Sequence, residues 1–247
     1  MDRFFGLKYS GEAFSVFSTV HMMTLLFLVI TNFLILFILM KMKNPKAAKI
    51  LRLSIASIML FHFISYEAWS FLTGDFTLKY SLPLHLCDIG ILFSAIMLFT
   101  KNKFLFEITY FWGLGGSLLA ILTPDIFQSF PHFIFMNYFL SHGGIITSVL
   151  FMIFIEKYRV TFKSIRKVFL FTNVYMVIIA GVNLLLKSNY LYICRKPNNP
   201  TLIDFLGPWP WYLLNLEVVT VTVFLLLFIP FSLKRSPSKN TPMDFSA

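Results

Sequence analysis

Apolar residues dominate seven long stretches of this chain, and the short segments between them hold most of its charges. Each stretch is close to the ~20 residues that an α-helix needs to cross the ~30 Å hydrocarbon core of a bilayer. The stretches cover residues 14–40, 51–73, 82–100, 104–123, 133–156, 165–187 and 209–231. This pattern predicts an all-α fold, a polytopic bundle of about seven transmembrane helices.

Charges and helix breakers mark the ends of several stretches. Lys41, Lys43 and Pro45 follow the first, and Pro124 follows the fourth. Pro83 lies at the start of the third, where a first-turn proline is tolerated. No internal repeat is visible, so residues 1–235 are expected to form one transmembrane domain. Residues 236–247 are polar and contain proline, and we expect a disordered cytoplasmic tail there.

Basic residues are distributed unequally between the two sides of the predicted bundle. Fifteen of the 21 lysines and arginines fall in the first, third and fifth connecting segments and in the C-terminal tail. Cytoplasmic loops of membrane proteins carry an excess of such residues. The N-terminus is therefore expected outside and the C-terminus in the cytoplasm, in a multi-pass protein of the cell membrane.

Composition supports the membrane class. Hydrophobic residues make up 57% of the chain and charged residues only 13%, against about a quarter charged in soluble domains. The formal net charge of +10 comes from short basic clusters beside apolar stretches, as in membrane-flanking loops. We therefore expect no nucleic-acid partner. The chain has two cysteines, Cys87 and Cys194, too few for a disulfide scaffold.

Polar and ionisable side chains within the predicted helices concentrate in the outer half of the bundle. Such groups are costly in a bilayer and usually face a cavity or a partner. Two tryptophans at the start of the last helix suit the headgroup region. We expect most of Glu67, His85, Asp88, His142 and Glu217 to surround one cavity open to the outer leaflet. The full set of polar and aromatic candidates is larger. Its members are Glu67, His85, Cys87, Asp88, Asp125, His132, Asn137, His142, Trp209, Trp211, Asn215 and Glu217.

Packing offers another explanation for several of these residues. His85 and Asp88 are three positions apart and could pair with each other. His142 precedes two glycines and could make a helix–helix hydrogen bond in a seam of small residues. His62 and Tyr66, four positions apart, are interpreted as packing residues and are not among the candidates.

Six motifs together carry a family resemblance. They are Leu82-Pro-Leu-His-Leu-Cys87, Phe111-Trp-Gly-Leu-Gly-Gly116, Leu122-Thr-Pro-Asp125, Phe130-Pro-His-Phe133, Phe139-Leu-Ser-His-Gly143 and Leu206-Gly-Pro-Trp-Pro-Trp211. With them the chain resembles the YwaF-type bacterial integral membrane proteins, which are related to the eukaryotic transmembrane protein 164. That relative is described as a cysteine-dependent acyltransferase that moves fatty acyl chains between phospholipids. The resemblance implies the same activity here, with Cys87 as the nucleophile.

Such chemistry needs a base beside the thiol, because the thiolate is the nucleophile and apolar burial opposes its formation. His85 is two positions from Cys87, which would place the two on different helical faces. His142, from another helix at similar depth, is the better candidate base, and Asp88 or Glu217 could orient it. A thioester would then pass its acyl chain to a lysolipid.

The remaining polar candidates are assigned to substrate binding. They are Glu67, Asp125, His132, Asn137, Asn215, Glu217, Trp209 and Trp211. The expected partner is a membrane phospholipid or lysophospholipid, and no cofactor or metal is expected.

Two alternatives stay open. In a zinc-dependent lipid hydrolase, His85, His132, His142 and Asp88 could supply a tetrahedral ligand set, although no closely spaced histidine pair is present. A small-solute transporter or a non-enzymatic membrane partner is the other class. For a transporter, broken helices in paired halves are expected, and the sequence shows no such symmetry.

Overall fold

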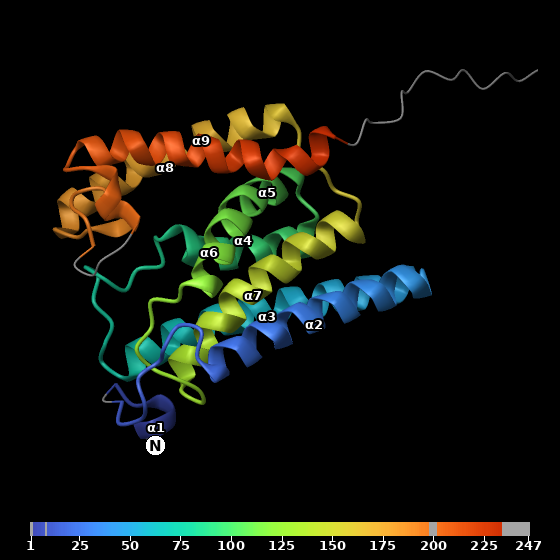
Figure 1. The fold of residues 1–247 in the computed structure, drawn as a ribbon, viewed down its shortest axis with the longest axis horizontal. Coiled ribbons are helices and arrows are strands. Elements are labelled where there is room, and N and C mark those ends of the chain that lie inside the picture. Colours follow the sequence, from blue (N-terminus) through green and yellow to red (C-terminus); the bar gives the residue numbers. More distant parts are fainter. Residues whose placement is uncertain (1, 8, 198–201, 234–247) are drawn as a thin grey trace, which may run out of the picture.

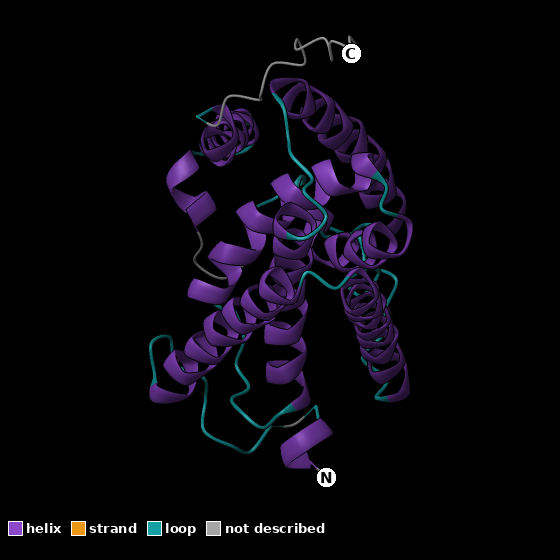
Figure 2. Cartoon of the chain, turned by 90° about the vertical axis from the view of Figure 1, so that its right-hand side faces the viewer, coloured by secondary structure: helices purple, strands orange, loops and turns teal. Residues whose placement is uncertain are grey.

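The structure, a computed structural model, describes residues 2–7, 9–197 and 202–233, and within these ranges it is helical with no strand (Figures 1 and 2). The long helices are α2 (Thr19–Met42), α3 (Pro45–Leu72), α4 (Leu86–Thr100), α7 (Phe133–Phe154), α8 (Phe162–Leu186) and α9 (Trp211–Ser232). A further helix, Lys103–Leu122, consists of α5 (Lys103–Ile108), the π-helical η1 (Thr109–Leu114) and α6 (Gly115–Leu122). The short segments are α1 (Asp2–Phe5), η2 (Tyr190–Tyr192) and η3 (Leu202–Leu206).

The predicted all-α, multi-pass architecture is confirmed. Six helices of the described residues are long and apolar enough to cross a membrane. The seventh, α4, has 15 residues and rises about 22 Å at 1.5 Å per residue, which is less than the ~30 Å hydrocarbon core. The sidedness of the termini stays a prediction, and the expected tail, 236–247, lies outside the described residues.

Local capping explains where the predicted helix boundaries shift. The side chain of Asn44 accepts hydrogen bonds from the backbone N–H groups of Lys46 and Ala47, and Pro45 occupies the first helical position. Both features favour a helix start, so α3 begins six residues before the predicted position 51. At α4, His85 is the N-cap in an extended conformation, so the helix begins at Leu86 instead of 82.

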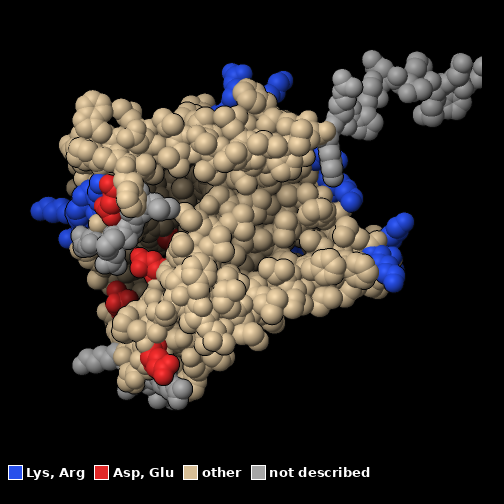
Figure 3. Space-filling view, viewed as in Figure 1, with Lys and Arg blue, Asp and Glu red and all other residues tan. Residues whose placement is uncertain are grey.

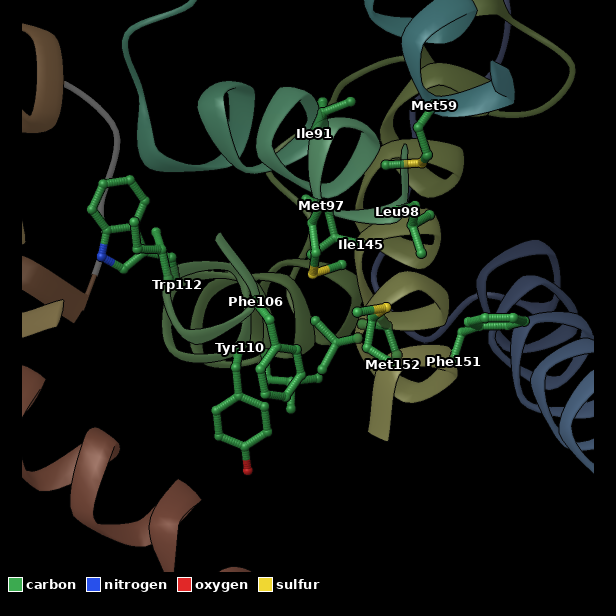
Figure 4. Close-up of a cluster of buried hydrophobic side chains, with 14 of the residues drawn as sticks. Met59, Ile91, Met97, Leu98, Phe106, Tyr110, Trp112, Ile145, Phe151 and Met152 are labelled. Carbon is green, nitrogen blue, oxygen red and sulfur yellow. The ribbon is translucent and has the colours of Figure 1, made fainter. Parts of the chain in front are cut away.

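In Figure 1 the helices form two outer layers with a central group of helices between them. Helices α2, α3 and α7 lie together, α8 and α9 form the opposite layer, and α4 with the α5–α6 helix lies between them. The core lies where the central helices meet, and Figure 4 shows part of it. Met97, Phe106, Ile145, Phe151 and Met152 there are all buried.

Glycines allow α7 to approach its neighbours closely. A Cβ atom at Gly144 would lie 2.2 Å from Sδ of Met59 on α3, and one at Gly143 would lie 2.6 Å from a methyl carbon of Leu28 on α2. Gly113 of η1 is similarly close to Ile145 of α7, at 2.5 Å. The small-residue seam suggested by the sequence is therefore present. It holds α7 against α3 close to the polar residues described next.

Candidate functional site

A cavity of about 460 Å³ lies where α3 ends and α4 and α7 begin. One face of α7 contributes Ile134, Asn137, Tyr138, Ser141 and His142, positions that repeat every three or four residues and therefore share one side of a helix. Helix α3 contributes His62, Phe63, Tyr66 and Glu67, and the start of α4 contributes His85, Cys87, Asp88 and Ile91. The cavity thus lies at a junction of the consecutive helices α3 and α4 with the more distant α7.

Seven of the candidates from the sequence line this cavity. They are Glu67, His85, Cys87, Asp88, Asp125, Asn137 and His142. His132, Trp209, Trp211, Asn215 and Glu217 do not line it. The visible acidic side chains gather at the corresponding left-hand end of the molecule in Figure 3, where basic ones also lie, whereas the right-hand end displays basic ones without acidic ones.

His142 is buried and held in one orientation. Its Nδ1 lies 2.8 Å from the carbonyl oxygen of Tyr138, and its ring packs on the Tyr138 ring with centroids 4.3 Å apart. A carbonyl only accepts hydrogen bonds, so Nδ1 carries the proton and Nε2 keeps a lone pair. The arrangement leaves His142 in the tautomer that a general base needs at Nε2.

His62, which sequence reasoning set aside, belongs to a hydrogen-bonded group on the cavity wall. Its Nε2 lies 2.7 Å from Oγ of Ser141 and 3.0 Å from the carbonyl oxygen of Asn137. Ser141 donates to the same carbonyl at 2.7 Å, so its Oγ accepts from His62. The sequence signal that could have identified His62 was its spacing of four residues from Tyr66, since both residues line the cavity together with Glu67.

The start of α4 places a thiol and a carboxylate at the cavity. Asp88 Oδ2 accepts a hydrogen bond from the backbone N–H of His85 at 3.3 Å, so Asp88 caps the helix through the backbone and does not pair with the imidazole as the sequence had suggested. The Cys87 thiol lies near Gly116 of α6, where an added Cβ would be 3.9 Å from Sγ.

The expectation about His85 assumed that this residue lies within the helix. The sequence placed His85 and Cys87 on different faces of one helix, yet both line the cavity. His85 is the N-cap, with φ −71° and ψ 152°, and helical periodicity does not extend to a residue in that conformation. Its ring instead packs beside Tyr190 and Tyr192, with centroid distances of 5.6 and 5.5 Å.

His132 has a structural position. It is fully buried and caps α7, where its Nδ1 accepts from the backbone N–H of Ile134 at 3.2 Å. Nε2 therefore carries the proton and donates to the carbonyl oxygen of Gly6 at 3.1 Å. Both ring nitrogens are occupied by backbone groups. Within the described ranges, no three His, Cys, Asp or Glu side chains are placed to hold a metal ion, so the proposed zinc ligand set does not assemble.

The candidates from the C-terminal part lie elsewhere. Glu217 accepts a hydrogen bond from Asn173 of α8 at 3.3 Å, and Asn215 donates to the carbonyl oxygen of Leu206 at 2.9 Å. Trp209 and Trp211 are mostly exposed. These residues are on α9 or the loop before it, in the layer that α8 and α9 form, so none of them can orient His142.

A second hollow, the vestibule, has a volume of about 380 Å³. It adjoins the cavity, because His85, Asp125 and Tyr192 line both spaces. Lys79, Arg195 and Lys196 give this vestibule a positive charge. Burial raises the pKa of the Tyr192 phenol, and the carboxylates of Asp125 and Asp88 raise it further. The phenol therefore stays protonated at neutral pH and can donate a hydrogen bond where the two spaces meet.

Fold and site together define a multi-pass helical membrane protein with a polar cavity at one end of its bundle. The chain belongs to the TMEM164 family, because the model of that family matches residues 16–228. This confirms the relation to transmembrane protein 164 indicated by the sequence motifs. No curated protein and no solved structure matches the chain.

Proposed function

We propose that this protein is an acyltransferase of the cell membrane that moves fatty acyl chains between phospholipids, with its site on the extracytoplasmic side. One observation carries the proposal: the Cys87 thiol and the His142 imidazole line the same cavity, and His142 is held in the tautomer that leaves Nε2 as a base. Membership in the TMEM164 family supports the same activity.

The proposed reaction has two steps. His142 Nε2 takes the proton of the Cys87 thiol, and the thiolate attacks the carbonyl carbon of a phospholipid ester. The ester C–O bond breaks, a thioester forms, and the lysolipid leaves as an alcohol with the proton from His142. In the second step a different lysolipid gives its hydroxyl proton to His142 and attacks the thioester. The product is a new phospholipid, and the free thiol is restored.

The lining of the two spaces suits a phospholipid. Lys79, Arg195 and Lys196 can attract the phosphate in the vestibule. The glycerol ester would then reach past Tyr192 into the cavity. Asn137 Oδ1 is buried on the cavity wall and has no hydrogen-bond partner among the described residues. Because an unpaired buried acceptor costs about 1–3 kcal/mol, we expect it to accept from the hydroxyl of a bound lysolipid.

Substitution of the thiol tests the proposal directly. Cys87→Ser preserves size but replaces a group of pKa ~8.5 with a far weaker acid, so transfer of a labelled acyl chain from phospholipid to lysophospholipid should be lost. His142→Gln should lose it as well. Cys194→Ser, which changes an exposed cysteine, is the matched control and should retain activity. Mass spectrometry of the intact wild-type protein should detect an acyl adduct on Cys87 that hydroxylamine removes.

Two outcomes would contradict the proposal. An active Cys87→Ser protein would show that the thiol only packs. If that activity also disappeared with a chelator, a metal-dependent lipid hydrolase would be favoured instead.

A further inference from the structure

A larger, separate cavity of about 720 Å³ lies at the opposite end of the bundle from the candidate site. The turn between α2 and α3 forms one wall, and the C-terminal ends of α4 and α7 form the other. Five basic side chains line it, together with a single acidic one, Glu156. The basic residues are Lys43, Lys49, Arg52, Lys101 and Lys157.

Arg52 and Glu156 form the fixed part of this cavity. Arg52 has a relative exposure of 5%, and its Nε lies 3.3 Å from Oε1 of Glu156. Nη1 of Arg52 donates to the carbonyl oxygens of Leu98 and, at 3.3 Å, Phe99 at the end of α4. Lys101 Nζ lies 2.6 Å from Oε2 of Glu156. Glu156, the only carboxylate among the described residues of the lining, is therefore already shared by two cations.

The other three lysines have no carboxylate within ion-pair distance in the described part of the chain. Two of them, Lys43 and Lys157, are in the left-handed conformation, with φ of 47° and 61°. Glycine or asparagine is the usual residue there, because a side chain adds strain. The chain thus places cations around this cavity at positions where a smaller residue would fit the backbone better.

Helix dipoles offset only part of this charge. Three helix C-termini and one N-terminus surround the cavity, and at about half an elementary charge each they amount to roughly one negative charge. The five basic residues exceed the one acid by four. About three positive charges are therefore left for an anionic ligand.

Apolar side chains continue the cavity toward the surface that faces lipid. Met40 and Phe154 line it and are also exposed, at 44% and 42%. A ligand that bound here would meet cations at one end and apolar side chains at the other. That combination matches an anionic phospholipid, since basic pockets between transmembrane helices bind such headgroups.

We propose that this cavity binds the phosphate headgroup of an anionic phospholipid in the leaflet opposite the candidate active site. Lys43, Lys49 and Lys157 contact the phosphate oxygens, and Arg52, held by Glu156 and Lys101, adds a fixed donor. The acyl chains lie along Met40 and Phe154. The basic excess at this end predicts the cytoplasmic leaflet. The proposal is independent of the acyl-transfer reaction.

The test measures thermal unfolding of the full chain in phosphatidylcholine nanodiscs as phosphatidylglycerol replaces part of the lipid. Wild-type protein should be stabilised in a saturable manner. The double variant Lys43→Gly, Lys157→Gly keeps the backbone, because glycine readily adopts positive φ. At about 1 kcal/mol per lysine, its apparent affinity should fall about 25-fold. Lys49→Gln should lower it about fivefold.

Lys187→Gly is the matched control. Lys187 also ends a helix in the left-handed conformation, with φ 51°, but it lies at the end of α8 and does not line the cavity. This variant should respond to phosphatidylglycerol as the wild type does. An equal response of all variants would overturn the proposal, as would equal stabilisation by phosphatidylcholine. If soluble glycerol phosphate stabilised the wild type as well as the lipid did, the ligand would be a free phosphate and the lipid assignment would be wrong.

Discussion

Replacing His132 by alanine should destabilise the protein and leave its chemistry intact. The substitution removes an N-cap of α7 and a partly buried hydrogen bond to the carbonyl oxygen of Gly6. Loss of an N-cap costs about 1 kcal/mol, and a carbonyl left unpaired costs about 1–3 kcal/mol. The free energy of unfolding should therefore fall by roughly 2–4 kcal/mol, which lowers Tm by roughly 4–16 °C for a chain of this size.

The variant His132→Asn separates the two contributions. Asparagine is among the best N-cap residues, so it should restore the hydrogen bond to the Ile134 N–H but not the one to Gly6. About 1 kcal/mol of the loss should be recovered. The assay is thermal unfolding in detergent or nanodiscs, followed by acyl transfer measured well below Tm. His142→Gln is the comparison, because it should abolish transfer with a smaller change in Tm.

Two results would refute this assignment. If the asparagine variant were as unstable as the alanine variant, capping would not be the role of His132. If His132→Ala kept its Tm and lost transfer, the residue would belong to the site after all.

Two further predictions concern packing and topology. Gly144→Ala should destabilise the protein by about 1–3 kcal/mol, because its Cβ would overlap Met59 Sδ at 2.2 Å. The control is Gly181→Ala on α8, where nothing lies within 4 Å of the added Cβ, and this variant should be stabilised by up to ~1 kcal/mol. Equal unfolding midpoints of the two variants would contradict the close packing of α7 on α3. For topology, the exposed Cys194 should react with an impermeant thiol reagent on intact cells, whereas Lys163→Cys in a cysteine-free background should not; labelling of both would overturn the predicted orientation.

The candidate site could be anticipated only in part. Glu67, Asp88 and His142 were found because charge inside an apolar helix is costly and therefore conspicuous. His62 was missed because one histidine four residues from a tyrosine is equally typical of packing. Its Nε2 is directed by Ser141 and the carbonyl oxygen of Asn137 on another helix, and no pattern within α3 reports which helix lies opposite.

The buried Glu107 was overlooked for a related reason. The inner half of the helices was expected to carry little charge beyond its flanking lysines and arginines. Glu107 has a relative exposure of 3%, pairs with Lys167 and accepts from Ser164 Oγ at 2.8 Å. These contacts join α5 to α8. A carboxylate so close to the end of an apolar stretch looks like an interfacial residue until its partners on another helix are known.

The sequence alone determined the all-helical, multi-pass fold and the approximate limits of its helices, because a bilayer requires long uninterrupted apolar segments with internally paired backbones. It also identified most of the polar residues within the apolar helices. Only the tertiary structure decided which of them share a cavity. A transmembrane helix is apolar toward lipid and toward its neighbours alike, so its hydrophobic pattern does not reveal which face turns inward. That rotation placed His142 beside the space that holds Cys87 and directed both nitrogens of His132 to the backbone.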